Sequence, residues 1–228
     1  MSGYRKILGS LLLMAVLAAV GLAAKTPQVT RADVALNEDV AGIRNGGLTV
    51  LAKAATAAAS STVGVALALL IPVLLWLVRR YQQAVRTLLL LGGAMAVTFA
   101  AKLSIHEHRP PKRLWLIPPD NPHSFPSGHT AIATAVAMTA FFLAGRRWRP
   151  LVLVLGAVFA AGTGFARIYL GVHYLPDVIA GALAAASAGL MTAGLLSLPP
   201  VRTRLDALQR PGRHRRTRTG ASRTRTGT

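Results

Sequence analysis

Six stretches of mostly apolar residues alternate with short polar segments along the chain. They cover residues 7–24, 62–78, 87–105, 127–144, 151–165 and 176–198. Most are close to the roughly 20 residues that a helix needs to cross the apolar part of a bilayer. The pattern predicts an all-α protein built as a bundle of six transmembrane helices.

The segments outside these stretches suggest how the rest of the chain is organised. Residues 31–40 place three acids among apolar residues, which predicts a short amphipathic helix with its carboxylates on a solvated face. Residues 201–228 are rich in Arg, Thr and Gly and poor in apolar side chains, which is typical of disorder. We therefore expect one membrane domain over residues 1–200 and a basic, disordered tail over 201–228.

The first apolar stretch has two interpretations. It is either a transmembrane helix or a signal peptide cleaved near the small residues Ala23 and Ala24. The uncleaved helix gives an even number of spans and keeps both basic termini on one side of the membrane, so we favour it.

Charge and composition exclude several classes of function. The 228 residues carry a net charge of +19, which by itself would suggest a nucleic-acid partner. The cations, however, gather in the tail and in the short loops 79–86 and 145–150, as the positive-inside rule describes for cytoplasmic segments. We expect a multi-pass protein of the plasma membrane with both termini in the cytoplasm, contacts with membrane lipids and no nucleic-acid partner. The chain has no cysteine, which excludes disulfides and a thiol nucleophile.

Three loops on the opposite, outer side carry the candidate chemistry. Ser127 is a suitable N-cap for the helix that follows, and Gly128 and His129 would lie at its anion-binding N-terminus. The other two loops add three cations, a histidine and a carboxylate: Lys102, Arg109, Arg167, His173 and Asp177. Lys102 and Arg109 are seven residues apart, so they share one helix face if the helix continues to Arg109. Together these groups could form a phosphate pocket with a nucleophile, an acid and an orienting carboxylate.

Two alternatives for these residues are less favoured. Arg109, Arg167 and Asp177 could be a structural ion-pair network, but such a network needs no histidines at these spacings. His106, His108 and His123 could ligate a metal, but their spacing is not that of a closed site, so we expect no metal.

The three segments K-x6-R-P (Lys102 to Pro110), P-S-G-H (Pro126 to His129) and R-x5-H-x3-D (Arg167 to Asp177) resemble, in this order, the signature motifs of the type 2 phosphatidic acid phosphatase (PAP2) family. That superfamily also includes vanadium haloperoxidases and bacterial acid phosphatases. One position departs from the family pattern, since Ala166 stands where a serine usually precedes the arginine.

The resemblance implies a PAP2/haloperoxidase-like fold, a metal-independent phosphatase without a cofactor, and a role for each motif residue. His173 would be the nucleophile that forms a phosphohistidine, Asp177 would orient it, and His129 would protonate the leaving group. The phosphate would be bound by Lys102, Arg109, Ser127, Gly128 and Arg167.

The membrane spans add a lipid to this interpretation. The substrate would be a lipid phosphomonoester or pyrophosphate such as undecaprenyl pyrophosphate, phosphatidic acid or phosphatidylglycerol phosphate, hydrolysed at the outer face of the membrane. A vanadate-dependent haloperoxidase and a non-catalytic lipid-binding or transport protein on the same bundle are the alternatives. The spans disfavour the first, and the intact His129, His173 and Asp177 disfavour the second.

Overall fold

The structure, a computed structural model, describes residues 2–209. Within that range the chain is helical and contains no strand, so the predicted all-α fold is confirmed. The elements are α1 (Gly3–Ala24), α2 (Pro27–Gly42), α3 (Gly46–Ala58), α4 (Ser61–Leu77), α5 (Tyr81–Ile105), the 3-10 turn η1 (Lys112–Leu114), α6 (Gly128–Leu143), α7 (Arg149–Tyr169), α8 (Leu175–Leu195) and α9 (Pro199–Gln209).

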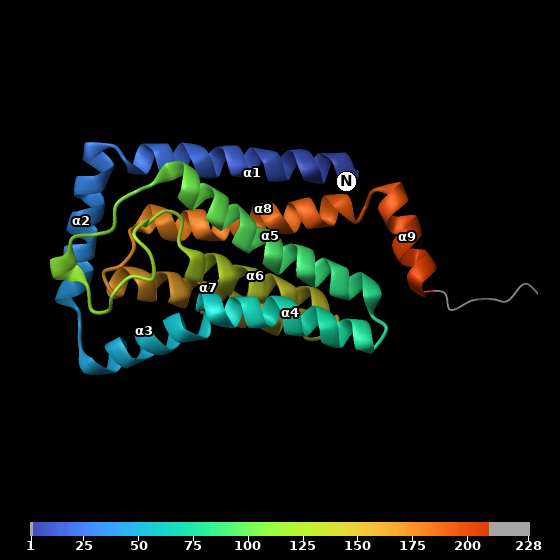
Figure 1. Ribbon diagram of the computed structural model, residues 1–228. Helices are drawn as coiled ribbons and strands as arrows, with labels where there is room; N and C mark the ends of the chain where they lie inside the picture. Colours follow the sequence, from blue (N-terminus) through green and yellow to red (C-terminus); the bar gives the residue numbers. More distant parts are fainter. Residues whose placement is uncertain (1, 210–228) are drawn as a thin grey trace, which may run out of the picture.

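Helix α8 lies in the middle of the bundle, where it packs against α1, α5 and α6 (Figure 1). Most of its buried positions are small, among them Ala180, Gly181, Ala184, Ala185, Ser187 and Ala188. Small residues let helix backbones approach closely, which is how helices associate within a membrane. At Gly181 a Cβ atom would lie 2.4 Å from the carbonyl oxygen of Ser127. The missing side chain therefore allows α8 to reach the start of α6.

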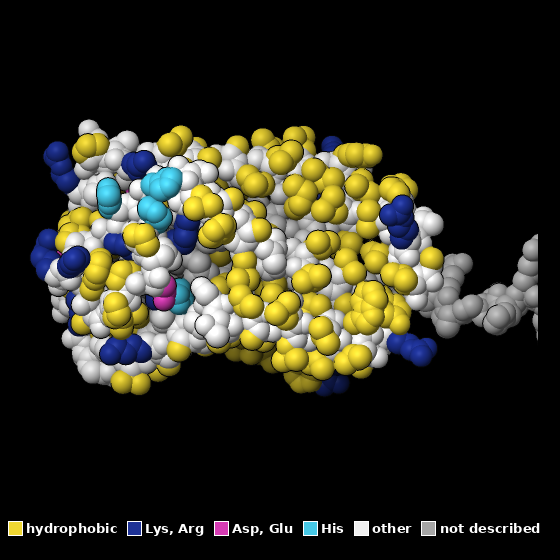
Figure 2. Space-filling view, viewed as in Figure 1, with side chains coloured by type: hydrophobic (Ala, Val, Ile, Leu, Met, Phe, Trp, Pro, Cys, Tyr) yellow, Lys and Arg dark blue, Asp and Glu magenta, His cyan; other side chains and the backbone are white. Residues whose placement is uncertain are grey.

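Each of the six predicted spans coincides with a helix, but the number of six membrane crossings is not confirmed. Four helices, α1, α5, α7 and α8, are long and apolar enough to cross a membrane. Helices α3 and α4, which meet at a bend of 41°, make a fifth span if they are taken together. Helix α6 is apolar but has only 16 residues. Figure 2 shows hydrophobic side chains over the middle of the bundle and charged side chains at its two ends.

Two segments outside the spans differ from the sequence-based expectations. The predicted amphipathic helix is present as α2, but Asp33, expected on a solvated face, is buried with 7% of its surface exposed. The tail was expected to be disordered from residue 201, whereas α9 covers Pro199–Gln209. Gln82 of α5 donates a hydrogen bond of 2.8 Å to Asp206 and so attaches α9 to the bundle. The rest of the predicted tail lies outside the described residues.

Candidate active site

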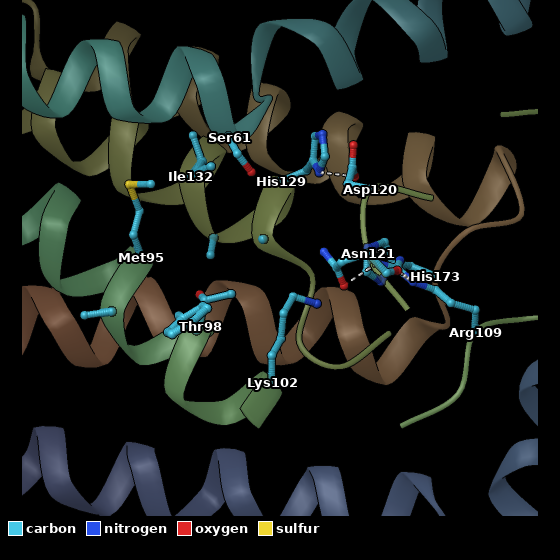
Figure 3. Close-up of a pocket in the computed structure, with 14 residues that line it drawn as sticks. Ser61, Met95, Thr98, Lys102, Arg109, Asp120, Asn121, His129, Ile132 and His173 are labelled. Carbon is cyan, nitrogen blue, oxygen red and sulfur yellow. Dashed lines mark hydrogen bonds and ion pairs between the residues drawn. The ribbon is translucent and has the colours of Figure 1, made fainter. Parts of the chain in front are cut away.

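The three motif segments meet at the end of the bundle that α2 covers, around a cavity of about 410 Å³ (Figures 1 and 3). Of the predicted site residues, five line this cavity: Lys102, Arg109, Gly128, His129 and His173. Ser127, Arg167 and Asp177 are fully buried beside it. All eight therefore belong to one region, although they come from four helices and two loops.

Lys102 and Arg109 reach the cavity in a different way from the one expected. Helix α5 ends at Ile105, and His106 turns the chain with a left-handed conformation (φ 52°). The two cations therefore do not share a helix face. Lys102 lies in the last turn of α5, where its Nζ donates to the carbonyl oxygens of His123 and Ser124 at 2.9 and 3.2 Å. Arg109 lies in the following loop.

The imidazole of His173 is held from both sides. Its Nδ1 lies 3.1 Å from Oδ2 of Asp177, and its Nε2 lies 2.9 Å from a guanidinium nitrogen of Arg109. Arg109 is itself fixed by hydrogen bonds to the carbonyl oxygens of Asn121 (3.1 Å) and Val172 (2.6 Å). An anion that Arg109 binds would thus lie next to Nε2, the nitrogen that faces the cavity.

His173 is neutral in this environment. It lies in the loop between α7 and α8 with 1% of its surface exposed. Burial, followed by the charges of Arg109 and Arg167, holds the pKa of His173 well below its ordinary value. A neutral imidazole that donates to Asp177 through Nδ1 has its lone pair on Nε2, where it accepts from Arg109, and an anion that draws Arg109 away would leave that lone pair free for attack on phosphorus.

Arg167, in the last turn of α7, is fully buried yet keeps unused donors. One guanidinium nitrogen lies 3.1 Å from Oδ2 of Asp120, while Nε and the other terminal nitrogen have no hydrogen-bond partner. The same Asp120 oxygen is 3.8 Å from Nδ1 of His129 (Figure 3). Since Asp120 is half-exposed, a carboxylate occupies the place beside Arg167 and His129 that an anionic ligand could take.

The start of α6 has the predicted capping arrangement. Ser127 is the N-cap, and its hydroxyl accepts from the backbone N–H (3.4 Å) and the side-chain hydroxyl (3.0 Å) of Thr130. The Ser127 side chain is therefore engaged inside the helix rather than directed into the cavity. Gly128 lines the cavity and leaves the helix N-terminus accessible to an anion.

Sequence reasoning assigned no role to several residues that complete the site. The hydroxyl of Ser124 donates to Oδ2 of Asp177 and lies 3.4 Å from Nδ1 of His173. Asn37 of α2 donates to the carbonyl oxygen of His173 at 3.1 Å. Asp120 and Asn121 line the cavity from the loop after η1. Asn37 in an otherwise amphipathic helix and Ser124 directly before the second motif were visible in the sequence, but no local pattern distinguishes them from ordinary loop or helix residues.

Ala166 and the histidine pair His106 and His123 pack against neighbouring side chains. Ala166, where the family pattern has serine, is buried in an apolar cluster with Ala52 and Tyr169. The rings of His106 and His123 pack edge to face with centroids 4.8 Å apart. Among the described residues, no group of three or more His, Asp or Glu side chains is arranged to hold a metal ion.

Comparison with known proteins identifies relatives of this arrangement. The family model of the PAP2 superfamily matches residues 83–197. The chain is similar to an undecaprenyl-diphosphatase of Sulfolobus acidocaldarius, with 32% identity over 87 residues, or 38% of this chain and 40% of the relative. It is also similar to phosphatidylglycerophosphatase B of Bacillus subtilis, with 38% identity over 64 residues, or 25% of this chain and 32% of the relative. These matches span less than half the length of either relative.

Solved structures match over more of the chain. One is the first transmembrane PAP2 type phosphatidylglycerolphosphate phosphatase from Bacillus subtilis, with a TM-score of 0.71, 26% identity, and coverage of 83% of this chain and 94% of that one. Another, LpxE of Aquifex aeolicus, shares the fold, with a TM-score of 0.58, 23% identity, and coverage of 71% and 94%. The helical bundle described above is therefore the architecture of these proteins.

Proposed function

Because the chain belongs to the PAP2 superfamily, we propose that it is a membrane phosphatase that hydrolyses a lipid phosphomonoester or pyrophosphate through a phosphohistidine on His173. The observation that carries this proposal is the placement of His173 between Asp177 at Nδ1 and Arg109 at Nε2, at the wall of a cavity. One nitrogen is oriented by a carboxylate, and the other faces the cation that would bring a phosphate to it.

The reaction would proceed in two steps. Nε2 of His173 attacks phosphorus, the bond to the leaving oxygen breaks, and His129 gives a proton to that oxygen. A water molecule, deprotonated by His129, then attacks the phosphohistidine, which releases phosphate and restores both histidines. Asp177 stabilises the positive charge that His173 carries in the intermediate.

The cations would stabilise the charge that develops on the non-bridging oxygens. Arg167 has two buried donors without partners, and Lys102 and Arg109 face the same cavity. Preorganised donors of this kind contribute about 3–4 kcal/mol each to transition-state stabilisation. We infer that these three cations, with the N-terminus of α6, take the place of a metal ion.

The lining of the cavity supports a lipid rather than a soluble phosphate ester. Next to the cationic end, Met95 and Phe99 of α5 and Ile132 of α6 line the same cavity (Figure 3). These residues lie on apolar helices, at the side where a hydrocarbon chain would extend. The names of the relatives suggest undecaprenyl diphosphate and phosphatidylglycerol phosphate as the first substrates to test.

Purified protein in detergent should release phosphate from at least one lipid of a panel containing a prenyl pyrophosphate, phosphatidic acid and phosphatidylglycerol phosphate. Activity should persist in EDTA and be inhibited by vanadate, which mimics pentacovalent phosphorus. His173→Ala should abolish both turnover and the radiolabelled phosphoenzyme. The exposed loop residue His108 provides the matched control, because His108→Ala should retain both. A phosphoenzyme on the His173→Ala protein, or activity that requires added Mg²⁺, would contradict the proposed mechanism.

A further inference from the structure

Glu107 is a buried acid that the proposed mechanism does not use. It lies in the loop after α5, directly beyond the left-handed residue His106, and only 5% of its surface is exposed. Its side-chain oxygen Oε2 is buried without a hydrogen-bond partner. The backbone holds Glu107 in place, because its carbonyl oxygen accepts a hydrogen bond of 2.9 Å from the N–H of Ser124. A buried carboxyl is costly without a partner, so its position needs an explanation.

The two oxygens of Asp177 have very different surroundings. Oδ2 accepts from the backbone N–H of Tyr174 at 2.8 Å and from the hydroxyl of Ser124, and it lies 3.1 Å from Nδ1 of His173. Oδ1 is buried and has no donor. The carboxylate that orients His173 thus has hydrogen-bond donors at Oδ2 and none at Oδ1.

Glu107 and Asp177 flank Ser124, whose backbone N–H donates to the carbonyl oxygen of Glu107 and whose hydroxyl donates to Oδ2 of Asp177, and each acid has one buried carboxyl oxygen without a partner. Two ionised carboxylates would repel and could not hydrogen-bond, whereas a single proton on one of them satisfies both orphaned oxygens. Burial, followed by the neighbouring Asp177, raises the pKa of Glu107 to about 9. Glu107 therefore keeps its proton at neutral pH.

Other charged groups around Glu107 shift its pKa in opposite directions, but together they leave Glu107 protonated at neutral pH. Asp33 of α2 is also buried, and it favours the protonated form of Glu107, while Lys25 at the end of α1 favours the ionised form. Lys25 is engaged with the carbonyl oxygen of Ile105 at 3.0 Å. Tyr174 is a further titratable neighbour, and burial, followed by the charges of Glu107 and Asp177, raises its pKa to about 12, so it stays neutral.

We propose that Glu107 is a positioning residue for His173: its protonated carboxyl donates to Oδ1 of Asp177 and keeps the negative charge of Asp177 directed, through Oδ2, at the nucleophilic histidine. This proposal rests on the proposed function, since it takes His173 as the nucleophile. The proton stays on Glu107 throughout the reaction. Its role is to donate a hydrogen bond to Oδ1 of Asp177, so that the Asp177 carboxylate cannot rotate away or take up the proton itself.

Three variants separate this role from a merely structural one. Glu107→Gln keeps a donor for Oδ1 but cannot ionise, whereas Glu107→Ala removes the donor. Glu107→Ala should lower kcat by roughly tenfold or more with little change in KM, because an acceptor of Asp177 is left unsatisfied. Glu107→Gln should retain kcat near pH 7. Asp39→Asn, which removes an exposed acid from α2, is the matched control and should resemble the wild type.

The pH profile is the readout that packing alone would not change. In the wild type, activity should fall as the pH rises through the pKa of Glu107, because ionised Glu107 repels Asp177 and no longer donates to it. The part of that alkaline limb that follows the ionisation of Glu107 should be missing from the Glu107→Gln profile, so its limb should differ from that of the wild type, whereas the limb of Asp39→Asn should not. An identical limb in wild type and Glu107→Gln, or a Glu107→Ala protein with wild-type kcat, would overturn the proposal.

Infrared difference spectroscopy tests the shared proton without any substrate. At neutral pH the wild-type protein should show the C=O stretch of a protonated carboxylic acid that is lost in Glu107→Gln and retained in Asp39→Asn. If this band is present but the protein hydrolyses no lipid phosphate, the proposed function is wrong while the shared proton is real. If lipid hydrolysis is found but the band is missing, the role of Glu107 is wrong and the phosphatase function stands.

Discussion

At the scale of single residues, the charged groups of the site contact one another. Asp120 lies against Arg167 and near His129, and Arg109 lies against His173. A bound phosphate would take over the contacts with Arg167 and Arg109. Under the proposed function, these are the contacts that a substrate phosphate would replace.

Asp120→Asn should therefore lower the KM for the lipid phosphate by about two- to fivefold, since a half-exposed ion pair with Arg167 no longer competes with the substrate. The value of kcat should change less. The measurement is a set of steady-state kinetics in detergent micelles. Asp206→Asn, at the opposite end of the molecule in α9, serves as the control. A higher KM in Asp120→Asn would mean that Asp120 helps to bind the substrate instead.

His129→Ala distinguishes the two histidines through the leaving group. A general acid contributes about 10²- to 10⁴-fold, and the loss is smallest when the leaving group needs little protonation. Attack on the terminal phosphorus of a prenyl pyrophosphate expels a prenyl phosphate, whereas attack on phosphatidic acid expels the alkoxide of diacylglycerol. The penalty of His129→Ala should therefore be smaller on a prenyl pyrophosphate than on phosphatidic acid, while His173→Ala is inactive on both. Equal penalties on the two substrates would argue against His129 as the leaving-group acid.

At the scale of elements, the N-termini of α6 and α8 are joined at the site. The N–H of Ser127 donates to the carbonyl oxygen of Asp177 at 2.9 Å, next to the close approach at Gly181. The carboxylate of Asp177 also caps the first turn of its own helix through the N–H of Tyr174. The same side chain therefore starts α8 and orients His173, so helix packing and site geometry depend on each other.

The turn after α7 is a second point at which an element fixes the site. Gly171 has a φ of 74°, and a Cβ there would lie 1.9 Å from the carbonyl oxygen of Leu114. Arg44 donates to that same oxygen at 2.7 Å and to the carbonyl oxygen of Tyr169 at 2.8 Å. These contacts hold the loop around η1 against the end of α7, close to His173.

Gly171→Ala should destabilise the protein, by about 1–3 kcal/mol from the backbone conformation alone. The clash with Leu114 should add to this and displace the loop that carries Arg109 and Asp120, so activity should fall as well. Thermal unfolding in detergent, monitored together with phosphate release, measures both effects. At Gly42 a Cβ would meet no atom within 4 Å, so Gly42→Ala is the control. Wild-type stability of Gly171→Ala would contradict the described contact.

At the scale of the whole molecule, the two ends of the bundle differ in charge. The described residues at the end opposite the cavity include ten Lys and Arg and only one acid, Asp206. The cavity end has nine Lys and Arg and six acids. The positive-inside rule places a cation-rich end such as the one opposite the cavity on the cytoplasmic side. We therefore expect the cavity to open at the outer face.

Single cysteines test this orientation cleanly, because the native chain has none. Pro118→Cys places an exposed thiol in the loop beside the cavity, and Arg147→Cys places one in the loop between α6 and α7. In intact cells a membrane-impermeant maleimide should label the first, and it should label the second only after the membrane is permeabilised. The cysteine-free parent should remain unlabelled. The reverse pattern would put the site in the cytoplasm.

The sequence by itself determined what depends on local periodicity and composition. A run of apolar residues must be buried in lipid or protein, and a run of roughly membrane-spanning length favours a helix. Each predicted span therefore coincided with a helix. Capping is equally local, and Ser127 is the N-cap of α6 as predicted. The motif residues also met at one end of the bundle, because antiparallel helices bring alternate loops to the same side.

Only the tertiary structure decided which residues touch within that site. Arg109 reaches the cavity from a loop rather than from the face of α5, since the helix stops at Ile105. Ser124 and Asp120 acquire their surroundings through contacts with residues more than forty positions away along the chain. Burial and the hydrogen-bond partners of a side chain arise from packing between distant segments, and no local pattern contains that information.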